Sequence, residues 1–203
     1  TNVDASVEEF LRFANHPKDE AQGEREIPFG RELWIEREDF EEVPPKGFKR
    51  LTLGGDVRLR GAGIMRCDAA IKDAEGRITE LHCTLDLESR PGMEGANRKV
   101  KGTIHWVSAK HAIATEVRLY DRLFTVPNPD IDDGGKTYVD YLNPESRKVV
   151  TGYIEPAAAQ AAAEQGFQFE RLGYFVADRY DHSSDAPVFN RSVTLRDTWA
   201  HKA

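Results

Sequence analysis

The chain has 203 residues, of which 39% are hydrophobic and 31% are charged, and its formal net charge is −7. This length suits one large domain or two small ones, and no apolar run approaches the roughly 20 residues that a membrane-spanning helix needs. The negative charge argues against a generic nucleic-acid binder, because bulk affinity for phosphate depends on a basic surface. The two cysteines, Cys67 and Cys83, lie in β-like runs and indicate reduced thiols in a cytoplasmic protein rather than a disulfide framework.

Residues 1–25 are mostly polar and are expected to form a linker or tail that need not be ordered. Within this segment, apolar side chains recur at spacings that suit one face of a short helix: Val3, Val7, Phe10, Leu11 and Phe13. Residues 15–26 contain Pro17 and Gly23 and are typical of a loop. A β pattern begins at Glu32.

Short β-like runs and turn residues dominate the rest of the chain. The Gly54-Gly55 pair predicts a hairpin between residues 48–53 and 57–64, and residues 73–76 predict a second hairpin that joins 70–71 to 78–87. Ser108 is a candidate cap for a short helix through Ala112, and an Ala-rich helix is expected from residue 155 or 156 to near 166. Further strands are expected at 100–107, 117–126, 149–154, 167–172, 173–177 and 188–195.

This pattern predicts an all-β fold of two linked small β-barrels with a few short helices. The first barrel is expected over residues 26–124 and the second over 125–203, with strands near the termini able to cross between them.

Motifs for metal binding and catalysis are absent from the sequence. There are six histidines, but no CxxC or HxxxH pattern places metal ligands together. There is also no GxSxG, HExxH or phosphate-binding Gly-rich loop ending in Lys-Ser/Thr. We therefore predict no catalytic residue, no metal and no cofactor in this chain.

A basic segment over residues 46–66 stands apart from the acidic remainder. Lys49 and Arg50 precede a strand, and Arg58 and Arg60 are two residues apart, so on a strand both guanidinium groups would lie on one face. Such paired donors can contact base edges or phosphates. On spacing alone, an ordinary solvated strand face is the favoured alternative.

A second candidate lies at residues 167–171. In an extended strand, Phe167, Phe169 and Arg171 share one face, and Gln168 lies on the other with Glu170. The Gln168 amide can donate and accept hydrogen bonds, and so could distinguish a base edge. The aromatic face is more often core than a stacking platform.

Several sequence blocks, in the same order, resemble the anticodon-binding region of the glutaminyl-tRNA synthetase family. The resemblance runs from about Ile27 to the C-terminus, and its blocks are KRLTLGGDVRLR (49–60), VKGTIHWVSAKHA (100–112), EVRLYDRLFTVPNP (116–129), FQFERLGYFVAD (167–178) and VFNRSVTLRDTW (188–199). The resemblance implies two β-barrels that grip an anticodon loop. It also implies that each anticodon base is splayed into its own pocket.

Residue by residue, the resemblance implies that Arg58, with Arg60, meets the first anticodon base. Gln168, with Arg171, would meet the central uridine. Arg50, with Lys49, would meet the third base, a guanosine. The family has a further anticodon-contacting arginine upstream that has no match here.

The resemblance further implies ATP-dependent glutaminylation by a catalytic domain that this chain lacks. The class I nucleotide-binding signatures are absent, so ATP with Mg²⁺ is expected only in that domain. The implied partners are glutamine tRNA and the catalytic domain of the same polypeptide, in a monomeric, cytoplasmic protein. The alternative is a β-barrel protein-interaction or structural domain without RNA binding, which the negative charge favours when the resemblance is set aside.

Overall fold

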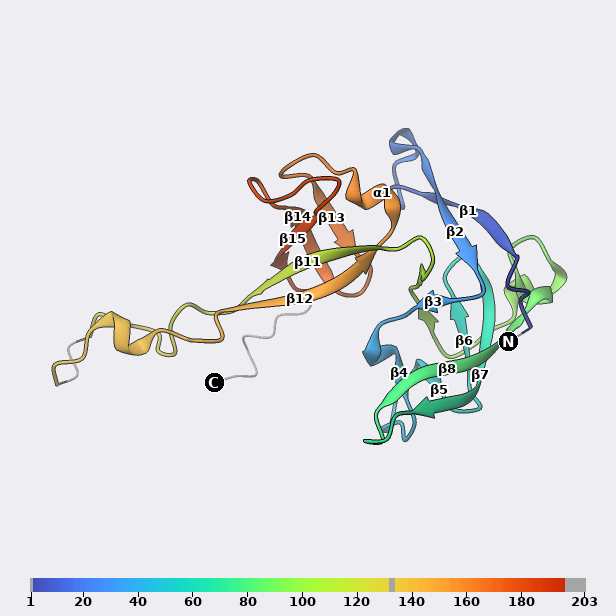
Figure 1. The fold of residues 1–203 in the computed structure, drawn as a ribbon, viewed down its shortest axis with the longest axis horizontal. Coiled ribbons are helices and arrows are strands. Elements are labelled where there is room, and N and C mark those ends of the chain that lie inside the picture. The colour runs from blue at the N-terminus through green and yellow to red at the C-terminus, as the bar shows by residue number, and fades with distance from the viewer. Residues whose placement is uncertain (1, 132–133, 196–203) are drawn as a thin grey trace. The chain divides into compact units, whose positions relative to one another are not determined.

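A computed structural model describes residues 2–131 and 134–195, and these residues form an all-β protein, as predicted (Figure 1). The chain divides into two compact units, Thr1–Ala112 and Ile113–Ala203, each of which is described by itself. The division falls between residues 112 and 113, whereas the sequence suggested a boundary between 124 and 125. None of the described helices is long and apolar enough to cross a membrane.

Short strands build the first unit. Its largest sheet has the order β8-β7-β6-β9, and three two-stranded pairs accompany it, β1-β2, β10-β3 and β4-β5. The strands are β1 (Glu8–Ala14), β2 (Glu24–Gly30), β3 (Leu33–Trp34), β4 (Phe40–Glu41), β5 (Leu51–Thr52), β6 (Asp56–Leu59), β7 (Gly63–Lys72), β8 (Ile78–Asp86), β9 (Thr103–Ile104) and β10 (Val107–Ser108). The single-turn 3-10 helices are η1 (Glu20–Gln22), η2 (Arg37–Asp39), η3 (Leu87–Ser89) and η4 (Glu94–Asn97).

The N-terminal segment is a hairpin strand, so the prediction of a helical face over residues 3–14 is wrong. Strand β1 pairs antiparallel with β2 along its whole length, and its burial alternates with a period of two (Figure 1). Leu11 and Phe13 pack against the core of the first unit, whereas Phe10 is exposed. Residues 8–14 and 24–25 therefore belong to a sheet and not to the predicted linker.

The two predicted hairpins have different outcomes. Strands β7 and β8 pair antiparallel around residues 73–77, which confirms the second hairpin with longer strands. The prediction of the first hairpin is wrong, because β5 and β6 do not pair with each other. Strand β5 pairs in parallel with β4, and β6 pairs with β7 and β9. The predicted strand over 100–107 is split into β9 and β10, and the residues after Ser108 form a turn rather than a helix.

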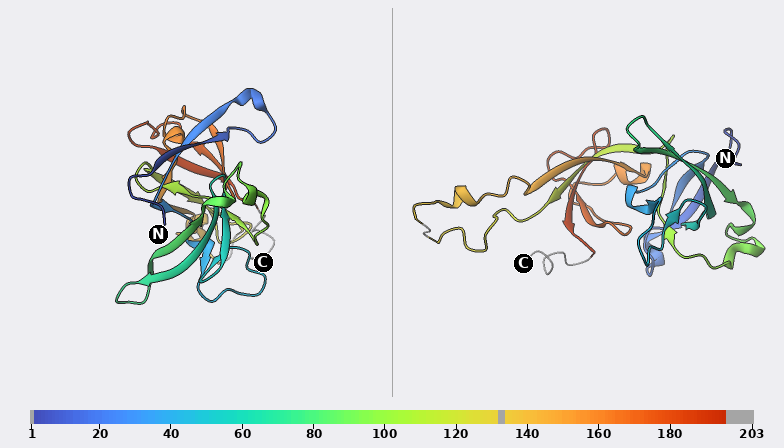
Figure 2. Two further views of the ribbon diagram at one scale, coloured as in Figure 1. Left: turned by 90° about the vertical axis from the view of Figure 1, so that its right-hand side faces the viewer. Right: turned by 90° about the horizontal axis from the view of Figure 1, so that it is seen from below.

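The second unit is one five-stranded sheet of order β12-β11-β15-β14-β13. Its elements are β11 (Ile113–Tyr120), η5 (Tyr138–Tyr141), β12 (Arg147–Ile154), α1 (Pro156–Ala159), β13 (Gly166–Phe169), β14 (Gly173–Ala177) and β15 (Val188–Val193). The connection between β11 and β12, yellow in Figure 2, carries η5. The Ala-rich helix is confirmed in place, but it ends at Ala159 rather than near residue 166.

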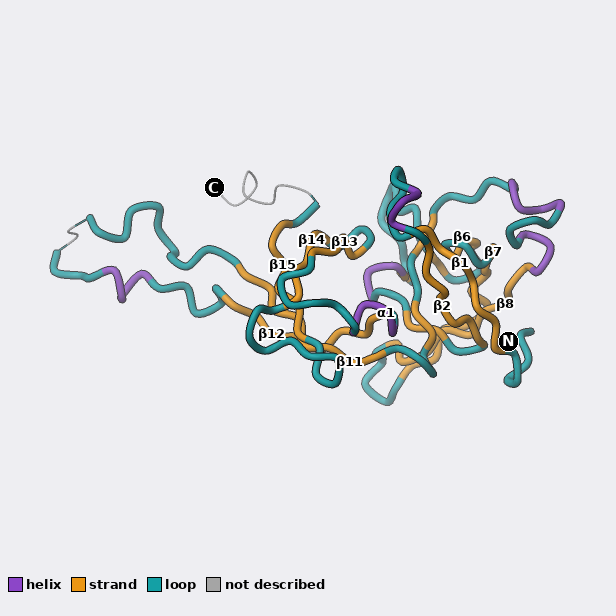
Figure 3. The backbone as a smooth tube through the Cα atoms, turned by 90° about the horizontal axis from the view of Figure 1, so that it is seen from above, coloured by secondary structure: helices purple, strands orange, loops and turns teal. Residues whose placement is uncertain are grey.

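Within the described residues both large sheets are open, with edge strands β8 and β9 in one unit and β12 and β13 in the other. The prediction of closed barrels is therefore wrong at the level of strand pairing, although strands and loops predominate throughout (Figure 3). Several strands have only two residues, which is too short to continue a sheet around a barrel. Residues 196–199 of the block over 188–199 lie outside the described residues.

Candidate nucleic-acid interface

Strand β6 buries the two apolar side chains that the sequence predicted to face inward, but it ends at Leu59, so Arg60 does not share a strand face with Arg58 as predicted. Val57 and Leu59 are fully buried in the first core, whereas Arg58 is half-buried and Arg60, just after the strand, is exposed. Burial of Val57 and Leu59 stabilises the unit by about 1.5–3 kcal/mol for each side chain. The same burial fixes the direction of Arg58, the residue between them.

The Arg58 guanidinium is tethered to a neighbouring loop. Its Nη2 donates a hydrogen bond to the carbonyl oxygen of Arg98 at 2.7 Å, and its Nη1 donates to that of Ser89 at 3.3 Å. That loop is held in turn, because the buried Ser89 hydroxyl accepts from the Ile64 amide at 2.6 Å. Arg58 is therefore a preorganised cation and not a freely solvated side chain.

The backbone of Arg60 is fixed on both sides. Its amide donates to the Ile104 carbonyl at 3.0 Å, and its own carbonyl accepts from the Trp106 indole Nε1 at 2.9 Å. The Trp106 ring packs edge-on against Phe29 in the core, with the ring centroids 5.2 Å apart. The exposed Arg60 side chain therefore projects from a rigid base.

Arg50 is anchored by a buried carboxylate. Its Nε lies 3.1 Å from Asp39 Oδ1, and its Nη1 donates to the Glu38 carbonyl at 3.3 Å. The Asp39 side chain is 1% exposed, whereas that of Arg50 is 40% exposed. One edge of the guanidinium thus neutralises Asp39 while the side chain still reaches solvent.

Gly102 brings these basic residues together. Its carbonyl accepts a hydrogen bond from the Arg58 amide at 2.9 Å. A Cβ built at Gly102 would lie only 1.8 Å from the carbonyl oxygen of Lys49. The backbone of residues 49–50 and that of Arg58 therefore pack on the same glycine, which clusters Lys49, Arg50 and Arg58 in space.

Sequence reasoning missed two basic residues beside this glycine. Lys99 and Lys101 are exposed and lie on the segment that leads through Gly102 into β9. The signal was present as KVKG at residues 99–102, but only the pairing of β9 with β6 shows that this segment adjoins residues 49–58. We call Lys49, Arg50, Arg58, Arg60, Lys99 and Lys101 the basic cluster.

Gln168 and Arg171 belong to the second unit. Gln168 is exposed on β13, while Phe167 and Phe169 on the opposite face pack in the core. Phe169 stacks on Phe175 with ring centroids 4.4 Å apart. This confirms that the aromatic face of the segment is core, and it leaves the Gln168 amide on the outer face.

Arg171 occupies an unusual backbone conformation in the turn between β13 and β14. Its φ is +65°, a left-handed region that few residues other than glycine adopt. Such strain persists where surrounding contacts impose it, and it is concentrated at functional sites. Glu164, just before β13, has the same conformation with a φ of +66°. Because β13 ends at Phe169, Arg171 does not share the strand face of Phe167 and Phe169 that its spacing predicted.

An ion-pair network stabilises the outer face of the second sheet. Arg118 of β11 lies within 2.6 Å of Glu116, 3.2 Å of Asp178 and 2.7 Å of Asp181. Hydrogen bonds, the strongest from Asn190 on β15, lower the pKa of Asp178 to about 2. The network joins β11, β15 and the loop after β14.

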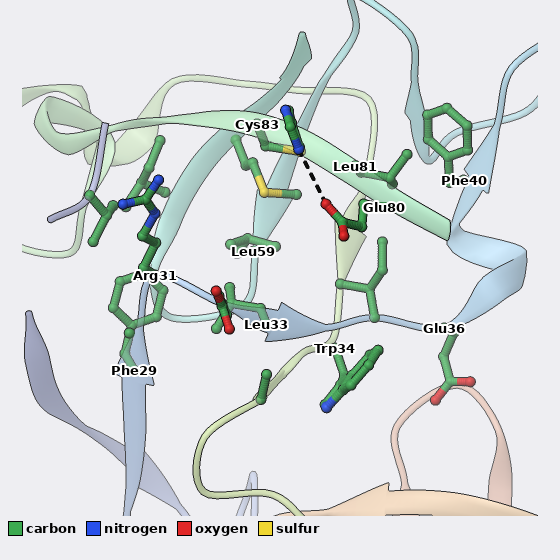
Figure 4. A pocket seen from close by; sticks show the side chains of 18 of the residues that line it. Phe29, Arg31, Leu33, Trp34, Glu36, Phe40, Leu59, Glu80, Leu81 and Cys83 are labelled. Atoms are coloured by element: carbon green, nitrogen blue, oxygen red, sulfur yellow. Dashed lines mark hydrogen bonds and ion pairs between the residues drawn. The ribbon is translucent and has the colours of Figure 1, made fainter. Parts of the chain in front are cut away.

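A pocket of about 780 Å³ lies in the first unit (Figure 4). Apolar side chains such as Phe29, Leu33 and Leu59 line it, and Glu80 and His82 form a pair 3.3 Å apart at its wall. None of the sequence-predicted site residues is among its lining residues. Among the described residues, no group of three or more His, Cys, Asp or Glu side chains is placed to hold a metal ion.

Comparison with known proteins decides the family. Two profiles described as the anticodon-binding domain of class I (E and Q) tRNA synthetases match residues 1–86 and 103–178. The chain belongs to this family of anticodon-binding domains. The first profile includes Lys49, Arg50, Arg58 and Arg60, and the second includes Gln168 and Arg171.

Similar proteins carry a more specific name. A glutamine–tRNA ligase of Xanthomonas euvesicatoria is 70% identical over 200 residues, which cover 98% of this chain. The glutamine–tRNA ligase of Xylella fastidiosa strain M12 is 69% identical over 199 residues, also 98% of the chain. The chain spans about a third (34%) of the length of these relatives.

Proposed function

We propose that this chain reads the anticodon loop of glutamine tRNA within a glutamine–tRNA ligase. The observation that carries the proposal is the basic cluster around Gly102, in a chain 70% identical to the corresponding part of a glutamine–tRNA ligase. Its local positive charge supplies phosphate and base contacts despite the overall charge of −7. In the whole protein, a catalytic domain of the same polypeptide joins glutamine to this tRNA in an ATP-dependent reaction.

We assign the base contacts as follows. Arg58 and Arg60 meet the first anticodon base, Gln168 and Arg171 the central uridine, and Arg50 and Lys49 the third base. The tethering of Arg58 and Arg50 supports these roles, because donors held in one geometry discriminate between bases better than flexible ones. Lys99 and Lys101 supply phosphate contacts beside the third-base residues.

ATP and Mg²⁺ belong to the catalytic domain in this proposal. No chemical step is assigned to this chain. We further propose that the protein acts as a cytoplasmic monomer, because one unit of each kind suffices to contact one anticodon loop.

The test is aminoacylation kinetics of the full-length protein with glutamine tRNA. Arg58→Ala should lower kcat/KM by about 5- to 150-fold, the equivalent of ~1–3 kcal/mol for a specific base contact. Arg12→Ala is the matched control, because Arg12 is an exposed arginine on β1 of the same unit. Nuclease footprinting should show protection of the anticodon loop. An anticodon loop that is not protected from the nuclease would refute the proposal, and so would equal kcat/KM values for Arg58→Ala and Arg12→Ala.

A further inference from the structure

Gln168 has an exposed aromatic residue directly opposite on the neighbouring strand. In the antiparallel pairing of β13 with β14, Gln168 faces Tyr174. Directly opposed residues share one face of a sheet, with their Cβ atoms about 4.5–5.5 Å apart. The next pair, Phe167 with Phe175, lies on the opposite face in the core. Gln168 and Tyr174 are therefore neighbours on the outer face.

A β-bulge sets the position of Tyr174. Tyr174 pairs with Val193 of β15, whereas Phe175 pairs with Arg191, so Ser192 is an extra residue in β15. The Ser192 hydroxyl donates to the Tyr174 carbonyl at 3.1 Å. Bulges redirect side chains and are common next to functional sites. Here the bulge puts Val193 beside Tyr174 on the outer face.

This arrangement requires glycine at position 173. Its φ is +150°, and a Cβ there would lie 2.5 Å from the carbonyl oxygen of Val193. The close approach of the two backbones holds β14 and the bulged strand together at Tyr174. The aromatic ring is therefore presented from a rigid sheet position and not from a mobile loop.

The Tyr174 ring is not part of the core, because the side chain is 47% exposed and its neighbour Val193 is 58% exposed. The Gln168 amide, which can contact a base edge, thus lies beside the exposed Tyr174 ring and the apolar side chain of Val193. An unstacked base needs both kinds of contact, since hydrogen bonds distinguish its edge and an aromatic face replaces the stacking that it loses.

We propose that Tyr174 is the stacking platform for the nucleotide whose edge Gln168 contacts. This inference rests on the proposed function and names a further specificity residue within it. The ligand is a single unstacked pyrimidine of an RNA loop, with its ring on Tyr174 and its edge toward the Gln168 amide. Val193 closes the pocket on the β15 side.

The experiment compares substitutions at Tyr174 in the full-length protein. Tyr174→Leu keeps an apolar side chain but removes the aromatic face, and should lower kcat/KM for glutamine tRNA by about 5- to 150-fold. Tyr174→Phe keeps the ring and should retain at least half of the wild-type value. Tyr153→Leu is the matched control, because Tyr153 is 48% exposed on edge strand β12 of the same sheet.

A direct readout separates stacking from a merely structural role. Glutamine tRNA that carries 5-iodouridine at the central anticodon position should cross-link to Tyr174 on irradiation, because this photochemistry favours a stacked aromatic ring. Mass spectrometry of the cross-linked peptide identifies the residue. A cross-link to any other residue, with none at Tyr174, overturns the inference.

The kinetic outcomes distinguish this inference from the proposed function. If Gln168→Ala lowers kcat/KM and Tyr174→Leu does not, the stacking role is wrong and the anticodon-reading function stands. If both variants match wild type, the assignment of this unit to anticodon reading also fails. If Tyr174→Phe loses as much as Tyr174→Leu, the hydroxyl and not the ring face is responsible, which likewise overturns stacking.

Discussion

Gly102→Ala is expected to disrupt the basic cluster without removing any charge. The new Cβ would lie 1.8 Å from the Lys49 carbonyl oxygen and 2.9 Å from its carbonyl carbon, whereas real Cβ contacts essentially never fall below 3.0 Å. Both atoms are backbone, so no side-chain rotation relieves the clash. The segments that carry Lys49 and Gly102 must therefore separate by more than about 1 Å.

The cost of this separation follows from two terms. Overpacking of a tight contact destabilises by about 1–3 kcal/mol. Loss of the 2.9 Å hydrogen bond from the Arg58 amide to the Gly102 carbonyl adds about 0.5–1.5 kcal/mol. The opening free energy of this region should therefore fall by roughly 2–4 kcal/mol in total. Because Arg50 and Arg58 are then displaced relative to each other, binding of glutamine tRNA should weaken as well.

Amide hydrogen exchange of the full-length protein measures the first effect at the Arg58 amide, and filter binding of glutamine tRNA measures the second. Gly30→Ala is the matched control, because its Cβ would lie at an ordinary 3.4 Å from the Val7 carbonyl oxygen. An unchanged exchange rate of the Arg58 amide in Gly102→Ala would refute the close approach of Gly102 to the Lys49 carbonyl. Faster exchange with unchanged tRNA affinity would show that the cluster is not the interface.

Two further predictions concern the second unit. Arg171→Gly removes the guanidinium but relieves a φ of +65°, a conformation that costs a non-glycine residue about 1–2 kcal/mol. The kcat/KM for glutamine tRNA should therefore fall, while the melting temperature should stay the same or rise. A melting temperature lower than that of Arg171→Ala would contradict this prediction. The pKa of Asp178 is about 2 in the folded protein against 3.8 for an unperturbed group, so its contribution to stability is complete above the unfolded pKa and is lost as pH falls from about 5 toward 2. Asp178→Asn should therefore reduce the loss of stability between about pH 5 and about pH 2, as followed by circular dichroism in an acid titration. The same loss in the variant and the wild type would show that the ionisation of this carboxylate is not linked to folding.

Arg58 on β6 shows what a local pattern determines. Val57, Arg58 and Leu59 alternate, and a period of two puts apolar and basic groups on opposite faces wherever the strand lies. Burial of Val57 and Leu59 then follows from hydrophobicity alone. The same reasoning correctly placed Phe167 and Phe169 inside and Gln168 outside.

The N-terminal strand shows where local pattern fails. Phe10, Leu11 and Phe13 fit a helical face, but pairing with β2 offers a full ladder of hydrogen bonds and a packing surface for Leu11 and Phe13. Tertiary pairing overrides helical spacing over so short a segment. The prediction of a hairpin around Gly54-Gly55 is wrong for a related reason, because β5 pairs with β4, and β6 pairs with β7 and β9.

The sequence by itself determined the all-β class, the facing of Val57, Arg58 and Leu59 on β6 and of Phe167, Gln168 and Phe169 on β13, and the family. These properties depend on periodicity, composition and the order of motifs, all of which are local or linear. Only the tertiary structure decided that Gly102 joins Lys49, Arg50 and Arg58, and that a bulge at Ser192 sets Tyr174 beside Gln168. Such contacts bring together residues distant in the chain, and strand register, which no single segment encodes, determines which of them meet.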